Sequence, residues 1–148
     1  MTQLQNDYYD QIAASYLDAP INQIFKPDMI ITKGNAVTRM TVQPEFSHAA
    51  GYMHGAAIFK LLDDSAWAAA QSVEMDFMVV TVSFTTYFLR PVNQGELTAS
   101  ASIVSKTKSN IVVSGSIVDE NNKRIAHGAG SFSISNFSVK DVFKSTIR

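Results

Sequence analysis

One helical segment, residues 54–70, constrains the fold more than any other part of the chain. Strong helix formers and large apolar residues occupy nearly the whole circumference of positions 56–70, which is typical of a helix enclosed by other elements. Two adjacent carboxylates, Asp63 and Asp64, interrupt this apolar pattern. Ionised carboxylates are rarely buried without a partner or a task. The segment therefore predicts a buried helix with a paired or functional carboxylate.

Composition sets the class of protein. The chain has 148 residues, of which 46% are hydrophobic and 17% charged, enough for one domain with a real core. A net charge of -1 without a basic run disfavours a nucleic-acid partner, and the absence of cysteine excludes disulfides and thiolate metal sites. No segment has the features of a signal peptide or a membrane span. We expect a soluble, cytoplasmic protein with no membrane partner.

The pattern along the chain alternates helices and strands. The apolar spacing of residues 4–17 predicts an amphipathic helix before Pro20, and a Lys33-Gly34-Asn35 turn predicts a hairpin between residues 29–32 and 36–42. Beyond the buried helix, segments rich in Val, Ile, Thr, Ser and Phe predict four successive antiparallel strands. These segments are residues 77–89, 96–106, 110–118 and 124–135.

These elements predict an α+β domain in which a curved antiparallel sheet wraps one long central helix, because only wrapping buries that helix on most sides. This is the hot-dog fold, here with an extra N-terminal helix. We expect a single domain over 1–148, with an N-terminal helical segment (1–26), a hot-dog core (27–135) and a C-terminal tail (136–148) that is a short helix or frayed.

Five short motifs in this order give the chain its family resemblance. They are His54-Gly55-Ala56 with Asp63, then Thr81-Val82-Ser83-Phe84-Thr85, Phe88-Leu89-Arg90-Pro91, Gly95-Glu96 and Ala126-His127-Gly128-Ala129-Gly130-Ser131-Phe132. Together they resemble the hot-dog acyl-CoA thioesterases of the PaaI-like, phenylacetate-pathway group over roughly residues 20–135. The resemblance implies hydrolysis of a medium-chain, long-chain or aryl acyl-CoA, with coenzyme A as part of the substrate and no other cofactor.

The resemblance also implies catalytic roles. Asp63 is the expected nucleophile or general base, and the Gly55 N–H at the helix start is expected to polarise the thioester carbonyl. Eight residues of helix place these groups about 12 Å apart, too far for one carbonyl to touch both. We therefore expect a homodimer with active sites at its interface, or a dimer of such dimers.

The two carboxylates have different expected environments. Asp64 follows Lys60 by one turn, so we expect an ion pair on the more exposed side of the helix. Asp63 shares a face with Phe59 and Trp67, an apolar setting that is expected to raise its pKa. Without the resemblance, an N–H or arginine partner in the core would explain Asp63 equally well.

His48, His54 and Thr81 can each be assigned a functional or a structural role. His48 stands where this family usually has Asn or Gln, so it is either a catalytic group that positions the thioester or water, a general base, or a loop residue with no role. His54 is expected to tie the loop to the helix start. Thr81 stands where a hydroxyl reaches the catalytic carboxylate, or it is an ordinary strand residue. The histidine spacing suits no metal site.

Further residues are expected to bind the substrate. Cations and polar groups at strand ends suit the phosphates of coenzyme A, with a solvated rim as the alternative interpretation. Two other functions stay open: a hot-dog enoyl-CoA hydratase or dehydratase, which would use His48 with Asp63, and a non-catalytic acyl-CoA binding domain. The expected substrate-binding residues are His54, Val82, Ser83, Arg90, Lys106, Lys108 and Asn110.

Overall fold

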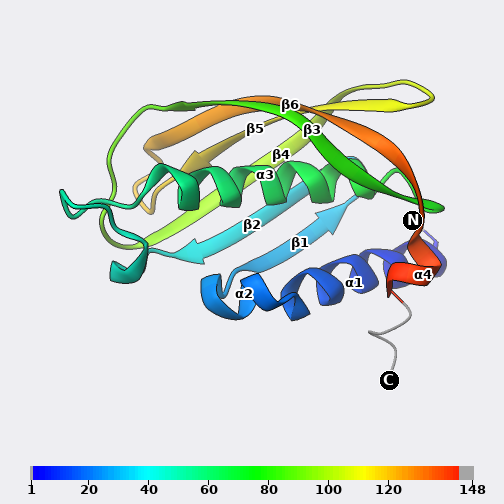
Figure 1. Ribbon diagram of the computed structural model, residues 1–148, viewed down its shortest axis with the longest axis horizontal. Coiled ribbons are helices and arrows are strands. Elements are labelled where there is room, and N and C mark those ends of the chain that lie inside the picture. The colour runs from blue at the N-terminus through cyan, green and yellow to red at the C-terminus, as the bar shows by residue number, and fades with distance from the viewer. Residues whose placement is uncertain (1, 144–148) are drawn as a thin grey trace.

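The computed structural model describes residues 2–143, and in it an antiparallel sheet wraps one long helix, α3 (Gly55–Gln71) (Figure 1). The strand order in the sheet is β1-β2-β4-β5-β6-β3. The predicted hot-dog architecture is confirmed. The strands are β1 (Asp28–Thr32), β2 (Asn35–Thr41), β3 (Phe77–Phe88), β4 (Glu96–Lys106), β5 (Asn110–Val118) and β6 (Arg124–Ser138).

Helix α3 forms where the sequence predicts it. The side chain of His54 caps its N-terminus, because Nδ1 accepts a hydrogen bond from the Ala56 N–H at 2.9 Å. Residues that face the sheet, such as Leu62, Ala66 and Ala69, have no exposed surface. Burial of this apolar surface is the main source of the fold's stability.

The four strands predicted after α3 are present, but they do not lie in chain order in the sheet. β3 does not pair with β4, but crosses to the far edge of the sheet and pairs there with β6, from Phe77 opposite Ser138 to Phe88 opposite Ala126. β4 pairs with β2 in its place, so β3 and β4, which follow one another in the chain, lie at different positions in the sheet. This crossover completes the wrapping of α3.

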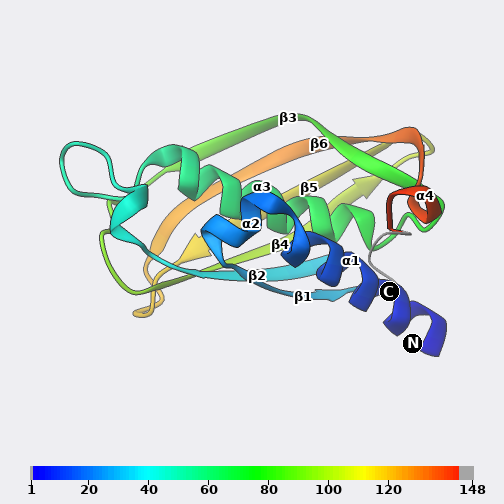
Figure 2. The same cartoon turned by 60° about the horizontal axis from the view of Figure 1, so that its bottom comes forward.

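Three further helices flank the wrapped core in the described chain (Figure 2). α1 (Gln3–Asp18) begins at a capping box between Thr2 and Gln5, packs its buried Ile12 toward β1, and ends before α2 (Pro20–Phe25). A 3-10 turn, η1 (Pro44–Phe46), lies in the loop before α3. The C-terminal segment forms α4 (Val139–Phe143), while residues 144–148 of the predicted tail lie outside the described residues. Among the described helices, none has the length and apolarity needed to cross a membrane.

One row of α3 side chains joins the helix to β3. We call it the β3 stripe, and its members follow one another at four-residue spacing, which keeps them on one slowly turning face. Each member meets β3 at a position nearer its start as α3 proceeds. The stripe consists of Gly55 against Phe88, Phe59 against Phe84, Asp63 against Thr81, Trp67 against Val79, and Gln71 against Phe77 and Val79.

The last two members bind the backbone of β3. Gln71 is fully buried, and its amide donates to Phe77 O at 3.0 Å and accepts from Val79 N–H at 2.9 Å. Trp67 Nε1 donates to Val79 O at 3.1 Å. Both backbone groups of Val79 are therefore satisfied by α3 side chains. These bonds attach the start of β3 to the C-terminal turns of α3.

Removal of the Gln71 amide is predicted to destabilise the fold. In Gln71→Met the side chain keeps its approximate volume, but the Val79 N–H and the Phe77 carbonyl lose their partners, so we expect the free energy of unfolding to fall by about 3 kcal/mol. Urea unfolding at fixed protein concentration measures the change. Gln94→Met, on an exposed loop, is the matched control. A loss in the Gln71 variant no larger than in the control would contradict this role.

Candidate active site

Asp63 is a half-buried carboxylate held by one hydrogen bond from β3. Thr81 Oγ1 donates to Asp63 Oδ1 at 3.0 Å. Burial is the largest influence on the pKa of Asp63 and raises it; the Thr81 hydrogen bond lowers the pKa, the Asp64 charge raises it and the Lys60 charge lowers it. The net direction is upward. A carboxylate with a raised pKa is a better proton acceptor, which suits a general base.

Asp64 has a different environment from its neighbour. It forms the predicted ion pair with Lys60, and the Tyr16 hydroxyl donates to Asp64 Oδ2 at 2.6 Å. The expectation that this pair lies on an exposed side is wrong, because α1 and α2 cover it and the two side chains are only 15% and 19% exposed. Lys60 also donates to Asn22 Oδ1 at 2.7 Å. Asp64 therefore links α3 to the N-terminal helices.

The start of α3 presents a free donor beside a cavity. Within residues 2–143, the Gly55 N–H has no hydrogen-bond acceptor, as expected for the first residue of a helix, and it lies at the positive end of the helix dipole. A cavity of about 260 Å³ borders Gly55. A Cβ at this position would lie 3.3 Å from the Phe88 ring, so glycine keeps the approach to the N–H open. His48 and Arg90 line the same cavity.

In both loop histidines, the ring nitrogen Nδ1 accepts a hydrogen bond from a backbone N–H. His48 Nδ1 accepts from the Ala50 N–H at 3.1 Å, and His54 Nδ1 accepts from the Ala56 N–H. Neutral imidazole carries its proton on the other nitrogen, so neutral His48, which lines the cavity, offers an Nε2–H donor. His54 ties the loop to the helix start, as its position predicts. In the described part of the chain, no group of His, Cys, Asp and Glu is arranged to hold a metal ion.

The single chain separates residues that were expected to cluster. Arg90 follows the end of β3 and shares the cavity at the N-terminus of α3, whereas Lys106 lies at the other end of the helix, where its Nζ donates to Val73 O at 2.7 Å. Lys108 and Asn110 follow Lys106 at that end, and Asn110 accepts from Ser131. Within one chain these groups do not form a single anion site. Gly55 and Asp63 are likewise about 12 Å apart along α3.

The outer edge of β3 has no strand partner within the described residues. Its sequence, Phe77–Phe88, contains no charge and no proline, and β6 is its only neighbour in the described sheet. Val82, beside Ser83, is 65% exposed, and Tyr87 and Phe88 are more than half exposed. A long apolar edge strand without charge or proline is open to pairing with another chain.

Sequence reasoning missed the roles of Trp67, Gln71 and Tyr16. The four-residue spacing of the β3 stripe is visible in the sequence, but it carries no information about which strand the stripe meets. Tyr16 and Asp64 are 48 residues apart in the chain, and no local pattern relates them. Their contact depends on how α1 packs against the core.

Two comparisons of the sequence with known proteins find similar families and relatives. The sequence profile of the thioesterase superfamily matches residues 50–126. A provisionally named esterase of Saccharolobus solfataricus is 30% identical over 104 residues, which cover 70% of this chain and 74% of the relative.

Two solved structures have similar folds. The PaaI protein from the phenylacetic acid degradation operon of E. coli has a TM-score of 0.83 and 25% identity, over 92% of this chain and 99% of that one. A thioesterase of Haemophilus influenzae has a TM-score of 0.76 and 19% identity, over 92% of each chain, and this likeness shows the fold alone.

The two neighbouring carboxylates are predicted to affect stability in opposite directions. Because the pKa of Asp63 is higher in the folded than in the unfolded chain, its charge opposes folding once the pH exceeds about 4. Asp63→Asn should therefore raise the free energy of unfolding at pH 7, and this gain should shrink as the pH falls toward 4. Asp64→Asn should lower it by about 3 kcal/mol, because Lys60 loses its partner in a mostly buried site.

Urea unfolding of both variants at pH 7 and pH 4 measures these changes. The control is Asp10→Asn, at an exposed position of α1. Equal losses in both variants would mean that Asp63 is a structural residue like Asp64.

Proposed function

The chain belongs to the thioesterase superfamily, and from this premise we propose that it hydrolyses the thioester of an acyl-coenzyme A with Asp63 as the reacting carboxylate. The protein is a thioester hydrolase. The observation that carries the proposal is the half-buried Asp63, which has a raised pKa and a hydroxyl partner but no ion pair within the described residues. Buried carboxylates in such settings are frequent at catalytic sites.

The proposed reaction begins at the thioester carbonyl. Asp63 takes a proton from water, and the oxygen of that water attacks the carbonyl carbon. The negative charge that develops on the carbonyl oxygen is stabilised by the Gly55 N–H at a helix N-terminus. The carbon–sulfur bond then breaks, and the coenzyme A thiolate receives the proton held by Asp63. In the alternative route Asp63 attacks the carbon itself, the carbon–sulfur bond breaks to release the coenzyme A thiolate, and water then hydrolyses the resulting mixed anhydride to the free acid and Asp63.

We propose that two chains complete each site. The distance between Gly55 and Asp63 along α3 requires that the N–H comes from one chain and the carboxylate from the other. The unpaired edge of β3 supplies a means of association, because two copies of this edge can pair about a twofold axis. His48 Nε2–H would then join the partner's Asp63 around the thioester.

The β3 stripe supports one register for this pairing. Gln71 and Trp67 already bind the backbone groups of Val79, so the edge that remains for a partner runs from Val80 to Phe88. A symmetric antiparallel pair over this segment centres near Phe84 and places Thr81 opposite the partner's Tyr87, one residue from the partner's Phe88. Phe88 contacts Gly55 in its own chain, so this register brings Asp63 toward Gly55 of the other.

The same dimer would unite the expected coenzyme A residues. Arg90 lies at the N-terminal end of α3, and Lys106, Lys108 and Asn110 lie at its C-terminal end. An antiparallel arrangement of two helices places opposite ends side by side, so the cations of both chains would converge at each site. Such a cluster suits the phosphates of coenzyme A, with His54, Val82 and Ser83 nearer the thioester.

A direct assay separates this function from the hydratase alternative. We expect free thiol from acyl-CoA substrates and no hydration of crotonyl-CoA. Hydration without thiol release would assign the hydratase reaction, and binding of acyl-CoA with neither reaction would assign a binding domain.

The hydrogen bond from Thr81 predicts a change in the pH profile. This bond lowers the pKa of Asp63, so Thr81→Val should raise it further. The active form is the ionised carboxylate, and the acid limb of kcat/KM should therefore move to higher pH. Thr85→Val, exposed on the same strand, is the matched control and should leave the limb in place. If the acid limb of the Thr81 variant stays in place or shifts to lower pH, ionisation of Asp63 does not control the rate.

Mixed dimers test the shared site. Asp63→Ala and Gly55→Pro should each fold and be nearly inactive. Proline fits the first position of a helix, and His54 before it is already extended, with ψ 139°. After the two variants are refolded together, random pairing makes half the dimers mixed, and half the sites in those are intact. Thiol release should recover to roughly a quarter of the wild-type rate.

The control is each variant refolded alone, with differential tags to confirm that mixed dimers form. No recovery in confirmed mixed dimers would place both groups in one chain.

A further inference from the structure

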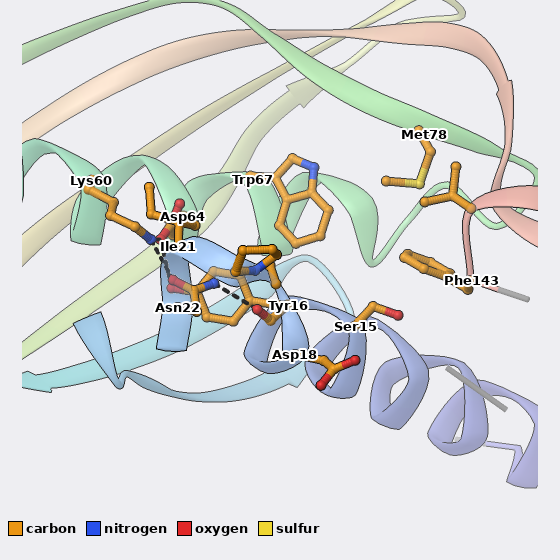
Figure 3. Close-up of a pocket in the computed structure, with 13 residues that line it drawn as sticks. Ser15, Tyr16, Asp18, Ile21, Asn22, Lys60, Asp64, Trp67, Met78 and Phe143 are labelled. Atoms are coloured by element: carbon orange, nitrogen blue, oxygen red, sulfur yellow. Dashed lines mark hydrogen bonds and ion pairs between the residues drawn. The ribbon is translucent and has the colours of Figure 1, made fainter. Parts of the chain in front are cut away.

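A second and larger cavity lies farther along α3 than the cavity at Gly55. It measures about 590 Å³ and opens between α3, the N-terminal helices, β3 and α4 (Figure 3). Trp67 and Met78 lie on one side of it, and Tyr16 and Ser15 on the other. The proposed reaction assigns it no role.

This cavity borders two α3 neighbours of the proposed reacting carboxylate. Asp64 and Trp67 line it, whereas Asp63, one residue before Asp64 and one helical turn before Trp67, does not. A thioester whose carbonyl faces Asp63 has two arms, the acyl group and coenzyme A. To enter the cavity, one of these arms has to pass Trp67, so the walls are compared with both arms.

Charge distinguishes the two cavities. Asp18, Asp64 and Lys60 are the ionisable acidic and basic residues that line the larger one, which gives it an acidic balance unsuited to phosphates. The smaller cavity is lined by Arg90 and His48 and by no carboxylate. The polyanionic coenzyme A is therefore favoured at the smaller cavity, and the uncharged acyl arm at the larger one.

Four polar residues of the larger cavity, Tyr16, Asn22, Lys60 and Asp64, are already paired with one another. Tyr16 donates to Asp64, Lys60 binds Asp64 and Asn22, and the Asn22 amide donates to Tyr16 O at 2.7 Å. An apolar ligand can cover this network without leaving a new unpaired group. The remaining walls are mostly apolar and include Trp67, Ile21, Met78 and Phe143.

We infer that this cavity binds the acyl group of the thioester and selects chains much longer than acetyl. The inference rests on the proposed function and gives α1, α2 and α4 a role in specificity. The volume of the cavity lies in the range of small-molecule sites. A methylene occupies about as much space as a liquid water, ~30 Å³. A chain on the order of ten carbons fits such a space in an open cavity.

Two positions on α2 provide a matched kinetic test. Ile21 lines the cavity and is 51% exposed, whereas Ile24 is 62% exposed and does not line it. Ile21→Trp should lower kcat/KM for decanoyl-CoA tenfold or more and change that for butyryl-CoA less than twofold. Ile24→Trp should change neither. Equal effects of Ile21→Trp on both substrates, or no effect on decanoyl-CoA, would overturn the inference.

Trp67 supplies a binding readout that does not depend on turnover. It is the chain's single tryptophan and it lines the cavity, so its fluorescence should change when the thioether S-decyl-CoA binds, and much less with coenzyme A alone. An equal response to both would overturn the inference even if thioesters are hydrolysed. A selective response in a protein that releases no thiol would support the cavity assignment and refute the proposed hydrolysis.

Discussion

The contact between α3 and β3 is the constraint on which the rest of the structure depends. The β3 stripe begins at the free N–H of Gly55, ends at the fully buried Gln71, and has Asp63 at its middle. Hydrogen bonds from the last two members satisfy the backbone of β3 where the strand would otherwise be unpaired. The same row of side chains therefore fixes the edge of the sheet and orients the carboxylate.

This arrangement combines stability and function in one element. Phe59 and Trp67, on either side of Asp63 in the stripe, contribute packing, while Asp63 itself is a cost to the fold because burial raises its pKa. Asp64, one residue away, has an ion pair and a tyrosine hydroxyl as partners. The two carboxylates thus have separate tasks, and the difference comes from which neighbouring element each one faces.

Local patterns in the sequence predicted the elements well and their arrangement less well. The apolar periodicity of residues 56–70 and the alternation in the strands depend on neighbours within each element, and both are confirmed. The crossover of β3 to the far edge depends on which strand edges are free, a tertiary property. The covered Lys60–Asp64 pair depends on contacts with Tyr16 and Asn22, which lie 38 to 48 residues away. The pairing of Asp63 with Thr81 agrees with the role that the family resemblance implies, and that role stays a prediction.

The central claim is that one thioester carbonyl lies between Asp63 of one chain and Gly55 of another. A crystal structure with an acyl-CoA analogue in which a methylene replaces the sulfur tests it directly, because this ligand keeps the carbonyl and cannot be hydrolysed. We expect the carbonyl oxygen about 3 Å from the Gly55 nitrogen of one chain, with the Asp63 carboxylate of the other facing the carbonyl carbon. A carbonyl bound away from Asp63, or held by both groups of a single chain, would contradict the account.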